Sequence, residues 1–347
     1  DRIGFRPDAK RPVVEPDLPP LQVTDPREID PHYEVVVVGA GAGGGVVACM
    51  LAEGGRRVLL LERGEALTAE QVSTDHLRNH RVALYGHNTG PPLQGHPRVL
   101  ENRGEARVMR PFEHGYHNNA MTVGGGTRVY EGQAWRFAPQ DFRMASIDGV
   151  PEGSSLADWP IDYETLAPFY ELAENEIGVS GELGHSHAGP RSDYPMPPVE
   201  PDFDGPVLRA AAEKLGWNVR AVPLAINTEP RHGRPACVAM GTCCGFACPT
   251  EARGNTANTM IPRALATGNC QLVTGAQVSR IEVDEGGRAR ALHFFHEAGG
   301  RPTEARIEAD LVVVSAGAVE TARLLLLSRD SRHPDGLGNR FDQVGRH

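Results

Sequence analysis

The stretch that decides the fold runs from Tyr33 to Gly64 and reads YEVVVVGAGAGGGVVACMLAEGGRRVLLLERG. Its first apolar run, 34–38, is typical of a strand buried on both faces of a parallel sheet. The glycines that follow form the pattern GxGxxG, with Gly39, Gly41 and Gly44. Helix formers and a second apolar run come next. The stretch therefore predicts a strand–helix–strand unit, which is the beginning of a Rossmann-type fold.

Each feature of this unit has a physical use in a dinucleotide site. Gly39 allows a tight turn, Gly41 lets a pyrophosphate approach the backbone, and Gly44 lets the helix pack on the strand. The helix N-terminus offers free N–H groups to the phosphates. Glu62 ends the second strand, where a carboxylate can accept hydrogen bonds from ribose hydroxyls and would repel a 2′-phosphate. The pattern predicts FAD or NAD rather than NADP.

Length and composition bound the rest of the chain. With 347 residues it exceeds the roughly 250–300 at which a single core stops growing, so we expect two domains. The net charge of −10 and the lack of a long basic run argue against nucleic acid or an anionic membrane surface as a partner. The sequence contains no apolar window of about 20 residues, so it predicts no transmembrane helix. The localisation stays open: the cytoplasm is favoured, and export behind a removed leader is the alternative because the chain begins with Asp1.

A second glycine segment, VGGGTRVY, covers residues 123–130. Gly124, Gly125 and Gly126 remove three consecutive side chains, so the main chain can lie against a flat or anionic ligand. Thr127 adds a hydroxyl donor. A glycine-rich hairpin without a ligand is the alternative.

Three stretches together resemble the glucose-methanol-choline (GMC) family of FAD-dependent oxidoreductases. They are the strand–helix–strand unit, the GGGT segment and SAGAVETARLLLLS at 315–328. The resemblance implies FAD, held non-covalently, because Val129 and Tyr130 stand where some members carry the histidine that bonds the flavin. It implies that the GGGT loop follows the pyrophosphate and passes beneath the isoalloxazine ring. The cofactor contacts that we predict are Gly39, Gly41, Gly44, Glu62, Arg63, Asn119, Gly124, Gly125, Gly126, Thr127, Val278, Ala316 and Gly317.

The resemblance also implies a domain organisation for this α/β chain. A Rossmann-type FAD-binding domain is expected at 32–136 and 236–347, interrupted by a partly represented α+β substrate domain at 137–235. Residues 1–31, rich in proline and charge, predict an extended arm. Within these domains the sequence predicts a loop over 85–104, a helix capped by Asp162, and a helix from Asn255 to Ala266.

Four of the six cysteines lie within ACVAMGTCCGFACP at 236–249. Thiolates in such a loop, with a proline after the last cysteine, are typical of iron–sulfur ligation. Some GMC dehydrogenases for glucose, gluconate or fructose carry a three-iron cluster at this place, which would pass electrons from the flavin to a partner. Zinc, disulfides or a loop without metal are the alternatives. The predicted cluster ligands are Cys237, Cys243, Cys244 and Cys248.

The activity implied by the resemblance is hydride transfer to FAD from a CH–OH group of a sugar, glycoside, polyol or other alcohol, by a dehydrogenase rather than an oxidase. The family's general base is a histidine of a C-terminal segment, and we expect it beyond His347. A complementary C-terminal chain or an electron-acceptor subunit is therefore the expected partner. Two alternatives remain open, namely a catalytically incomplete FAD-binding electron-transfer subunit and an NAD-linked dehydrogenase.

Overall fold

The computed structural model describes residues 19–68, 71, 90–91, 95–102, 104–111, 113, 115–116, 120–185, 189–200, 204–239 and 246–346. The chain divides into two compact units. We call the first the sheet unit, which is made of 18–130, 242–249 and 255–347, and the second the helical unit, which is made of 1–17, 131–241 and 250–254.

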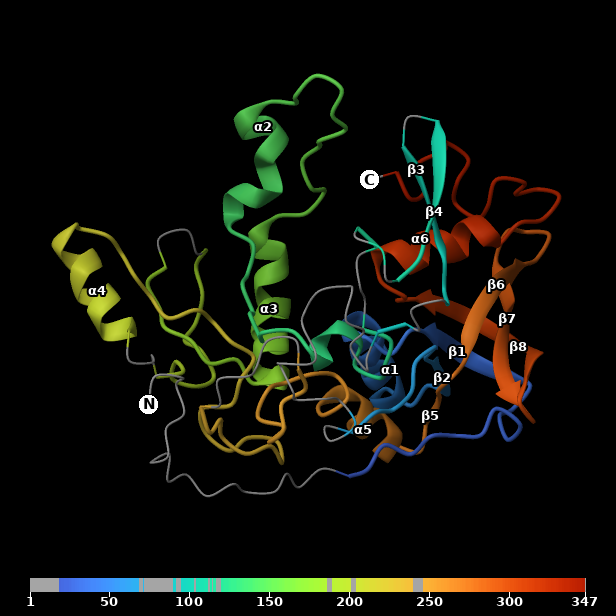
Figure 1. Cartoon of the computed structure of the whole chain (residues 1–347), viewed down its shortest axis with the longest axis horizontal. Helices are drawn as coiled ribbons and strands as arrows, with labels where there is room; N and C mark the ends of the chain where they lie inside the picture. The colour runs from blue at the N-terminus through green and yellow to red at the C-terminus, as the bar shows by residue number, and fades with distance from the viewer. Residues whose placement is uncertain are drawn as a thin grey trace. The chain divides into compact units, whose positions relative to one another are not determined.

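The main sheet of the sheet unit has six strands in the order β5–β2–β1–β8–β7–β6 (Figure 1). The strands β1, β2 and β5 run parallel to one another and to the C-terminal half of β8. The N-terminal half of β8 pairs antiparallel with β7, and β7 pairs antiparallel with β6. The strand bounds are β1 His32–Val38, β2 Val58–Leu61, β5 Cys270–Val273, β6 Gln277–Val283, β7 Ala289–Ala298 and β8 Arg301–Val314. One long strand thus belongs to both a parallel sheet and an antiparallel meander.

The predicted strand–helix–strand unit is confirmed. Helix α1 spans Ala42–Glu53 between β1 and β2, with Gly41 at its N-cap and Gly54 at its C-cap. The strands β1 and β2 pair in register, from Val35 opposite Val58 to Val38 opposite Leu61. Both strands are buried on both faces, as the apolar runs predicted, and the α/β Rossmann-type fold class is confirmed with them.

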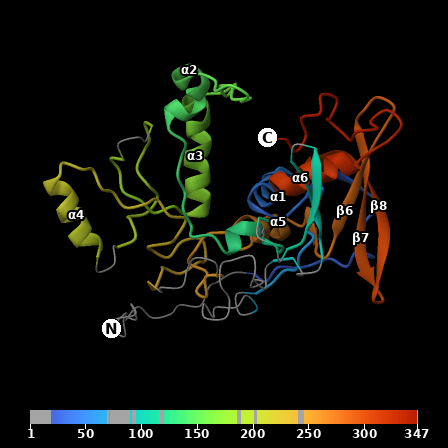
Figure 2. The ribbon, with the colours of Figure 1, turned by 45° about the horizontal axis from the view of Figure 1, so that its top comes forward.

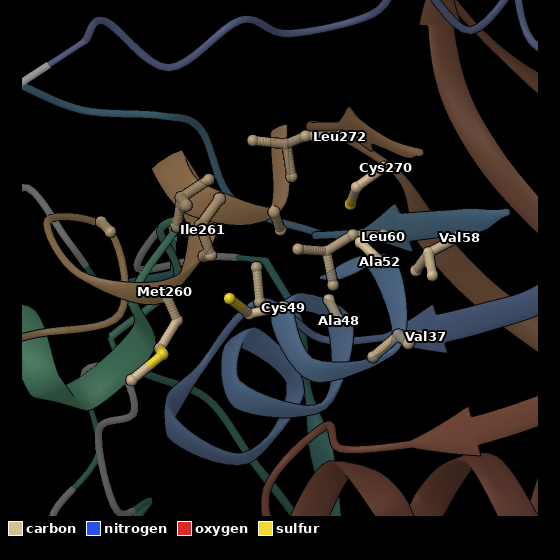
Figure 3. Close-up of a cluster of buried hydrophobic side chains, with 14 of the residues drawn as sticks. Val37, Ala48, Cys49, Ala52, Val58, Leu60, Met260, Ile261, Cys270 and Leu272 are labelled. Atoms are coloured by element: carbon tan, nitrogen blue, oxygen red, sulfur yellow. The ribbon is translucent and has the colours of Figure 1, made fainter. Parts of the chain in front are cut away.

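Two hydrophobic clusters cover the two faces of this sheet. On one face, Val37 and Leu60 pack with side chains of α1 and of α5, which spans Met260–Ala266 (Figure 3). On the other face, alternate residues of the same strands pack against the β6–β8 meander and Leu324 of α6, which spans Ala318–Leu327. Figure 2 shows α6 lying alongside the meander strands. The sheet therefore separates two layers, and its strand ends remain available for a ligand.

Two predictions of local structure in the sheet unit were wrong. Part of the predicted loop 85–104 is strand β3, Arg98–Asn102, which pairs with β4, Glu105–Met109. Most side chains of this hairpin are exposed, so its sequence lacks the alternation that marks a half-buried strand. The predicted helix over 255–266 begins only at Met260, because the side chains of the preceding residues bond to nearby backbone groups instead.

The helical unit contains α2, Met144–Asp148, α3, Tyr163–Ile177, and α4, Gly205–Lys214. The predicted cap of α3 is confirmed, since Oδ1 of Asp162 accepts a hydrogen bond from the backbone N–H of Thr165 at 2.8 Å. None of the helices in the described part of the chain has both the length and the apolar composition needed to cross a bilayer.

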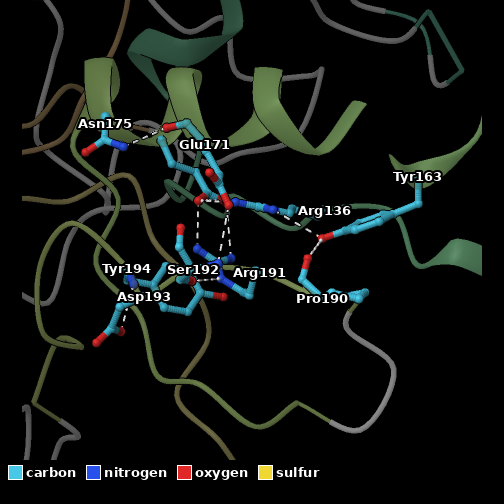
Figure 4. Close-up of polar contacts among 10 residues, drawn as sticks. Arg136, Tyr163, Glu171, Asn175, Pro190, Arg191, Ser192, Asp193 and Tyr194 are labelled. Carbon is cyan, nitrogen blue, oxygen red and sulfur yellow. Dashed lines mark hydrogen bonds and ion pairs between the residues drawn. The ribbon is translucent and has the colours of Figure 1, made fainter. Parts of the chain in front are cut away.

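A buried carboxylate ties α3 to the segment that follows it in the helical unit. The two oxygens of Glu174 each accept hydrogen bonds from Arg136 and from Arg191, at 2.7–3.2 Å (Figure 4). The guanidinium of Arg191 also stacks 3.4 Å from the ring centroid of Tyr194, and that of Arg136 donates to the hydroxyl of Tyr163. All three charged side chains are nearly buried, so the arrangement holds the 189–194 segment against the helix.

Candidate functional site

A cavity of about 570 Å³ opens in the sheet unit at the carboxyl ends of β1, β2 and β8. Open α/β sheets bind their ligands at this edge, and the volume lies within the roughly 300–1,000 Å³ of small-molecule sites. The cavity is lined by Val38, Gly39, Gly41, Ala42, Gly43, Leu61, Glu62, Arg63, Ala120, Met121, Gly125, Gly126, Val129, Tyr130, Ala276, Gln277, Val278, Ser315, Ala316, Gly317, Ala318, Val319, Glu320, Arg323 and Leu324. The two predicted glycine segments therefore face one cavity.

The glycines of the first segment have two different uses. Gly39 has φ of +99°, and a Cβ on it would lie 2.5 Å from the carbonyl oxygen of Ser315. A Cβ on Gly44 would lie 1.8 Å from the carbonyl oxygen of Gly39. A Cβ on Gly41, by contrast, would meet nothing within 4 Å. Gly39 and Gly44 let backbone segments approach each other, whereas Gly41 leaves open space beside the cavity.

Glu62 is held at the cavity wall by backbone donors. Its Oε2 accepts from the N–H of Ala40 and its Oε1 from the N–H of Gly64, both at 2.8 Å. Only 8% of the residue is exposed, and this burial raises the pKa of the carboxyl while the two N–H groups act in the opposite direction. Each oxygen keeps acceptor capacity on its second lone pair. The predicted contact to a ribose stays a prediction.

The second glycine segment packs directly on the first. The N–H of Gly124 donates to the carbonyl oxygen of Ala40 at 2.8 Å, and a Cβ on Gly125 would lie 3.0 Å from the Cα of Gly41. The short 3₁₀ helix η2, Gly125–Arg128, follows. The hydroxyl of Thr127 donates to the carbonyl oxygen of Gly124 at 2.6 Å, so it stabilises its own turn. Its predicted contact to a cofactor stays a prediction, as does that of Gly124.

The remaining predicted contacts lie at the far side of the same cavity. Val278 of β6 and Ala316 line it, and so does Gly317, which has φ of +80° and stands at the N-cap of α6. Arg63 lines it as well. Asn119 lies outside the described residues.

An ion-pair cluster that no pattern in the sequence predicted lies at this wall. Glu320, in the first turn of α6, is nearly buried and pairs with Arg63 at 3.3 Å, with Arg98 at 3.0 Å and with Arg323 at 2.8 Å. Burial opposes ionisation of Glu320, but the three guanidinium groups outweigh it and lower its pKa to about 2. Arg323 lies one turn from Glu320 on the same helix, whereas Arg63 and Arg98 come from distant parts of the chain and only the fold brings them to Glu320.

The cysteine segment is described in part. Cys243 and Cys244 lie outside the described residues, and Cys237 and Cys248 are half-buried. Within the ranges that the structure describes, no group of three or more His, Cys, Asp or Glu side chains is placed to hold a metal ion. The iron–sulfur cluster stays a prediction.

Comparisons with known proteins agree with this geometry. Residues 194–345 match the model of the GMC oxidoreductase family. The chain is 32% identical to 6'''-hydroxyparomomycin C oxidase of Streptomyces lividus and 34% identical to 2-methyl-1,2-propanediol dehydrogenase of Mycolicibacterium austroafricanum. It is 30% identical to the fructose dehydrogenase large subunit of Gluconobacter japonicus. These matches cover 93%, 90% and 90% of this chain, and 55%, 54% and 57% of the relatives. The chain spans about half the length of the curated relatives it matches.

Solved structures share the fold. Pyridoxine 4-oxidase from Mesorbium loti superposes with a TM-score of 0.52 at 22% identity, over 86% of this chain and 52% of that protein. The R554A variant of formate oxidase from Aspergillus oryzae, described in a study of FAD modification, superposes with a TM-score of 0.54 at 17% identity, over 86% and 47%. These structural likenesses show the fold, and the match of residues 194–345 together with the curated relatives makes the chain similar to GMC oxidoreductases.

Proposed function

We propose that this chain binds FAD non-covalently and belongs to an oxidoreductase that acts on CH–OH groups of sugars or other alcohols. One observation carries the proposal: the backbone of both glycine segments meets at a single cavity whose wall also presents the Glu62 carboxylate. A dinucleotide needs an uncrowded backbone for its phosphates and an acceptor for its ribose, and this cavity offers both.

The residues of the cavity would divide the work of holding the cofactor. The N–H groups at the start of α1, from Ala42 and Gly43, would bind the pyrophosphate. Glu62 would accept from the ribose, and Val278 would lie against the adenine. Gly125 and Gly126 would leave room for the isoalloxazine ring. When bound, FAD would supply the acceptor for a hydride from the alcohol carbon, and this hydride carries both electrons.

The substrate class rests on the relatives. Their names specify a hydroxyparomomycin oxidase, a propanediol dehydrogenase and a fructose dehydrogenase. A primary or secondary hydroxyl group is the chemistry that these proteins share. The relatives include both oxidases and dehydrogenases, so they do not favour either type. We propose a dehydrogenase, and the predicted iron–sulfur cluster of the cysteine segment is the only ground for this choice.

The cluster has its own test. A "large subunit" among the relatives supports an enzyme with more than one chain, in which electrons leave the flavin for a partner. We expect iron and inorganic sulfide in the anaerobically purified protein and their loss in Cys248→Ser. Negligible iron in both proteins would eliminate the cluster.

FAD binding is tested on the purified chain. We expect the purified chain to show a flavin absorbance spectrum. Acid denaturation should release the flavin into solution, because the proposed cofactor is not covalently attached. Gly41→Val adds a side chain to open space at the cavity, so this variant should keep its far-UV circular dichroism and lose flavin. A chain that binds NAD but takes up no added FAD would contradict the proposal and support an NAD-linked dehydrogenase.

A further inference from the structure

A buried polar turn, Asn255–Thr259, stands between the two glycine segments in the sheet unit. Its five residues, NTANT, are each less than 9% exposed although four of them are polar. Polar side chains are costly to bury unless they make hydrogen bonds. Their hydrogen bonds therefore indicate what the turn holds in place.

The turn fixes its own shape first. The side chain of Asn255 accepts from the N–H of Ala257 at 3.0 Å, and the side chain of Asn258 accepts from the N–H of Asn255 at 2.9 Å. The hydroxyl of Thr259 donates to the carbonyl oxygen of Asn255 at 2.7 Å. Helix α5 follows directly and packs on α1 within the core. The turn is therefore fixed by its own hydrogen bonds and leads into a helix that packs on α1, whose N-cap is Gly41.

Thr256 reaches the first glycine segment. Its hydroxyl lies 3.2 Å from the carbonyl oxygen of Gly41 and 3.5 Å from that of Ala40. Its Cβ occupies the space beside Gly45, where an added Cβ would lie only 2.6 Å away. Gly45 lies outside the GxGxxG pattern, so this contact gives the third consecutive glycine of α1 a use of its own.

The next residue of the turn reaches the second glycine segment. The side chain of Ala257 would lie 3.2 Å from a Cβ on Gly124. The carbonyl oxygen of Ala40 accepts from the N–H of Gly124 at 2.8 Å as well as facing the Thr256 hydroxyl. Two adjacent residues of one turn thus contact both segments, and one carbonyl group is shared between them.

The hydroxyl also faces the carbonyl group of a peptide at the cavity. The carbonyl oxygen of Gly41 accepts from the N–H of Gly45 at 3.0 Å and faces Thr256. A trans peptide points its N–H opposite to its C=O. The N–H of Ala42 therefore points away from the turn, and Ala42 lines the cavity.

We infer that the Asn255–Thr259 turn is a brace that sets the spacing of the two glycine segments, with the Thr256 hydroxyl as a positioning group for the phosphate-binding backbone. The inference rests on the proposed binding of FAD in the cavity. Thr256 itself does not line the cavity, so it acts through Gly41 and Ala42.

The test compares Thr256→Val, which keeps the shape and removes the hydroxyl, with Thr256→Ser, which keeps the hydroxyl. Both carbonyl groups retain a backbone donor, so Thr256→Val should fold. We expect FAD to bind Thr256→Val about three- to ten-fold more weakly than the wild type, and Thr256→Ser to restore wild-type affinity. The thermal midpoint of each protein without FAD reports stability separately.

Three results with the Thr256 variants would overturn the inference. The first is wild-type affinity for FAD in Thr256→Val. The second is a loss of affinity in Thr256→Ser as large as that in Thr256→Val. The third is a loss of affinity that is explained by a lower thermal midpoint of the FAD-free variant. Gly45→Ala is the second arm and applies even if Thr256→Val does not fold. Its methyl group displaces Thr256, so FAD affinity should fall, and unchanged affinity there would also contradict the brace. A wild-type chain that takes up no FAD would instead refute the proposed function.

Discussion

The carbonyl oxygen of Gly39 fills the position that a side chain at Gly44 would take, since a Cβ there would lie 1.8 Å from that oxygen. We therefore expect Gly44→Ala to destabilise the chain by about 3 kcal/mol, because neither backbone segment can move away without breaking the strand–helix contact. Gly43→Ala is the matched control, with the nearest atom at an ordinary 3.6 Å. Urea unfolding of both variants measures the difference. Equal stability of the two variants would contradict this packing.

The second prediction concerns pH and Glu62. Burial raises the pKa of this carboxyl above its ordinary value of 4.5, so the folded chain binds its proton more tightly than the unfolded chain. The contribution of Glu62 to the free energy of unfolding is then largest below pH 4.5 and declines as the pH rises through the raised pKa. Calorimetry of the cofactor-free wild type and of Glu62→Gln across this range measures both stabilities. The stability of the wild type minus that of Glu62→Gln should fall as the pH rises. A difference that grows with pH would mean that the backbone donors outweigh burial.

Glu320 should behave in the opposite way. Its pKa is lowered to about 2, so its ion pairs stabilise the fold fully above pH 4.5 and are lost as the pH falls towards 2. At neutral pH, Glu320→Gln leaves three guanidinium groups around a neutral amide and should cost about 3–5 kcal/mol. Glu308→Gln removes a half-exposed partner of Arg306 and should change stability little. Denaturant unfolding measures the loss of unfolding free energy in both variants. A loss of similar size in both would show that the Glu320 cluster stabilises the fold no more than an exposed ion pair.

The fourth prediction tests the buried carboxylate of the helical unit. Glu174→Ala leaves Arg136 and Arg191 buried without their shared partner, which should cost about 3–5 kcal/mol. The segment that Glu174 holds should then separate from α3, and trypsin should cleave after Arg191 faster than in the wild type. Mass spectrometry of timed digests measures this rate. Glu164→Ala, an exposed change in the first turn of the same helix, should leave the rate unaltered, and an unaltered rate in Glu174→Ala would refute the anchoring role.

The elements of the fold that the sequence predicts are those that depend on short, local sequence patterns. Two apolar runs, a helix between glycines, and a capping aspartate each specify their own neighbourhood, so β1, α1, β2 and the start of α3 follow from short windows. The hairpin β3–β4 was missed because exposed strands carry no alternation of apolar residues. The N-terminus of α5 was misplaced because helix propensity was given more weight than the tendency of Asn and Thr to bond to nearby backbone.

The candidate site divides in the same way. Among the glycines that the sequence singled out, Gly39, Gly41, Gly125 and Gly126 line the cavity. The Glu320 cluster could not be predicted, because Arg98 lies 222 residues from its partner and no local pattern links them. Thr256 lies 215 residues from Gly41. The one available signal was composition, since five consecutive small or polar residues before an apolar helix suggest a turn with side-chain hydrogen bonds.

The double pairing of β8 has a consequence for how the protein is made. His32 and Asp310, which pair at the start of the contact between β1 and β8, are 278 residues apart. At roughly 5–20 residues per second of synthesis, β1 leaves the ribosome about 15–55 s before its central partner exists. During that interval a strand of consecutive valines has one open edge, which favours capture by a chaperone or pairing with another chain. β8 pairs with this edge and joins the meander to the parallel strands. The part of the cavity wall that Ser315 and α6 provide therefore exists only after β8 has been synthesised.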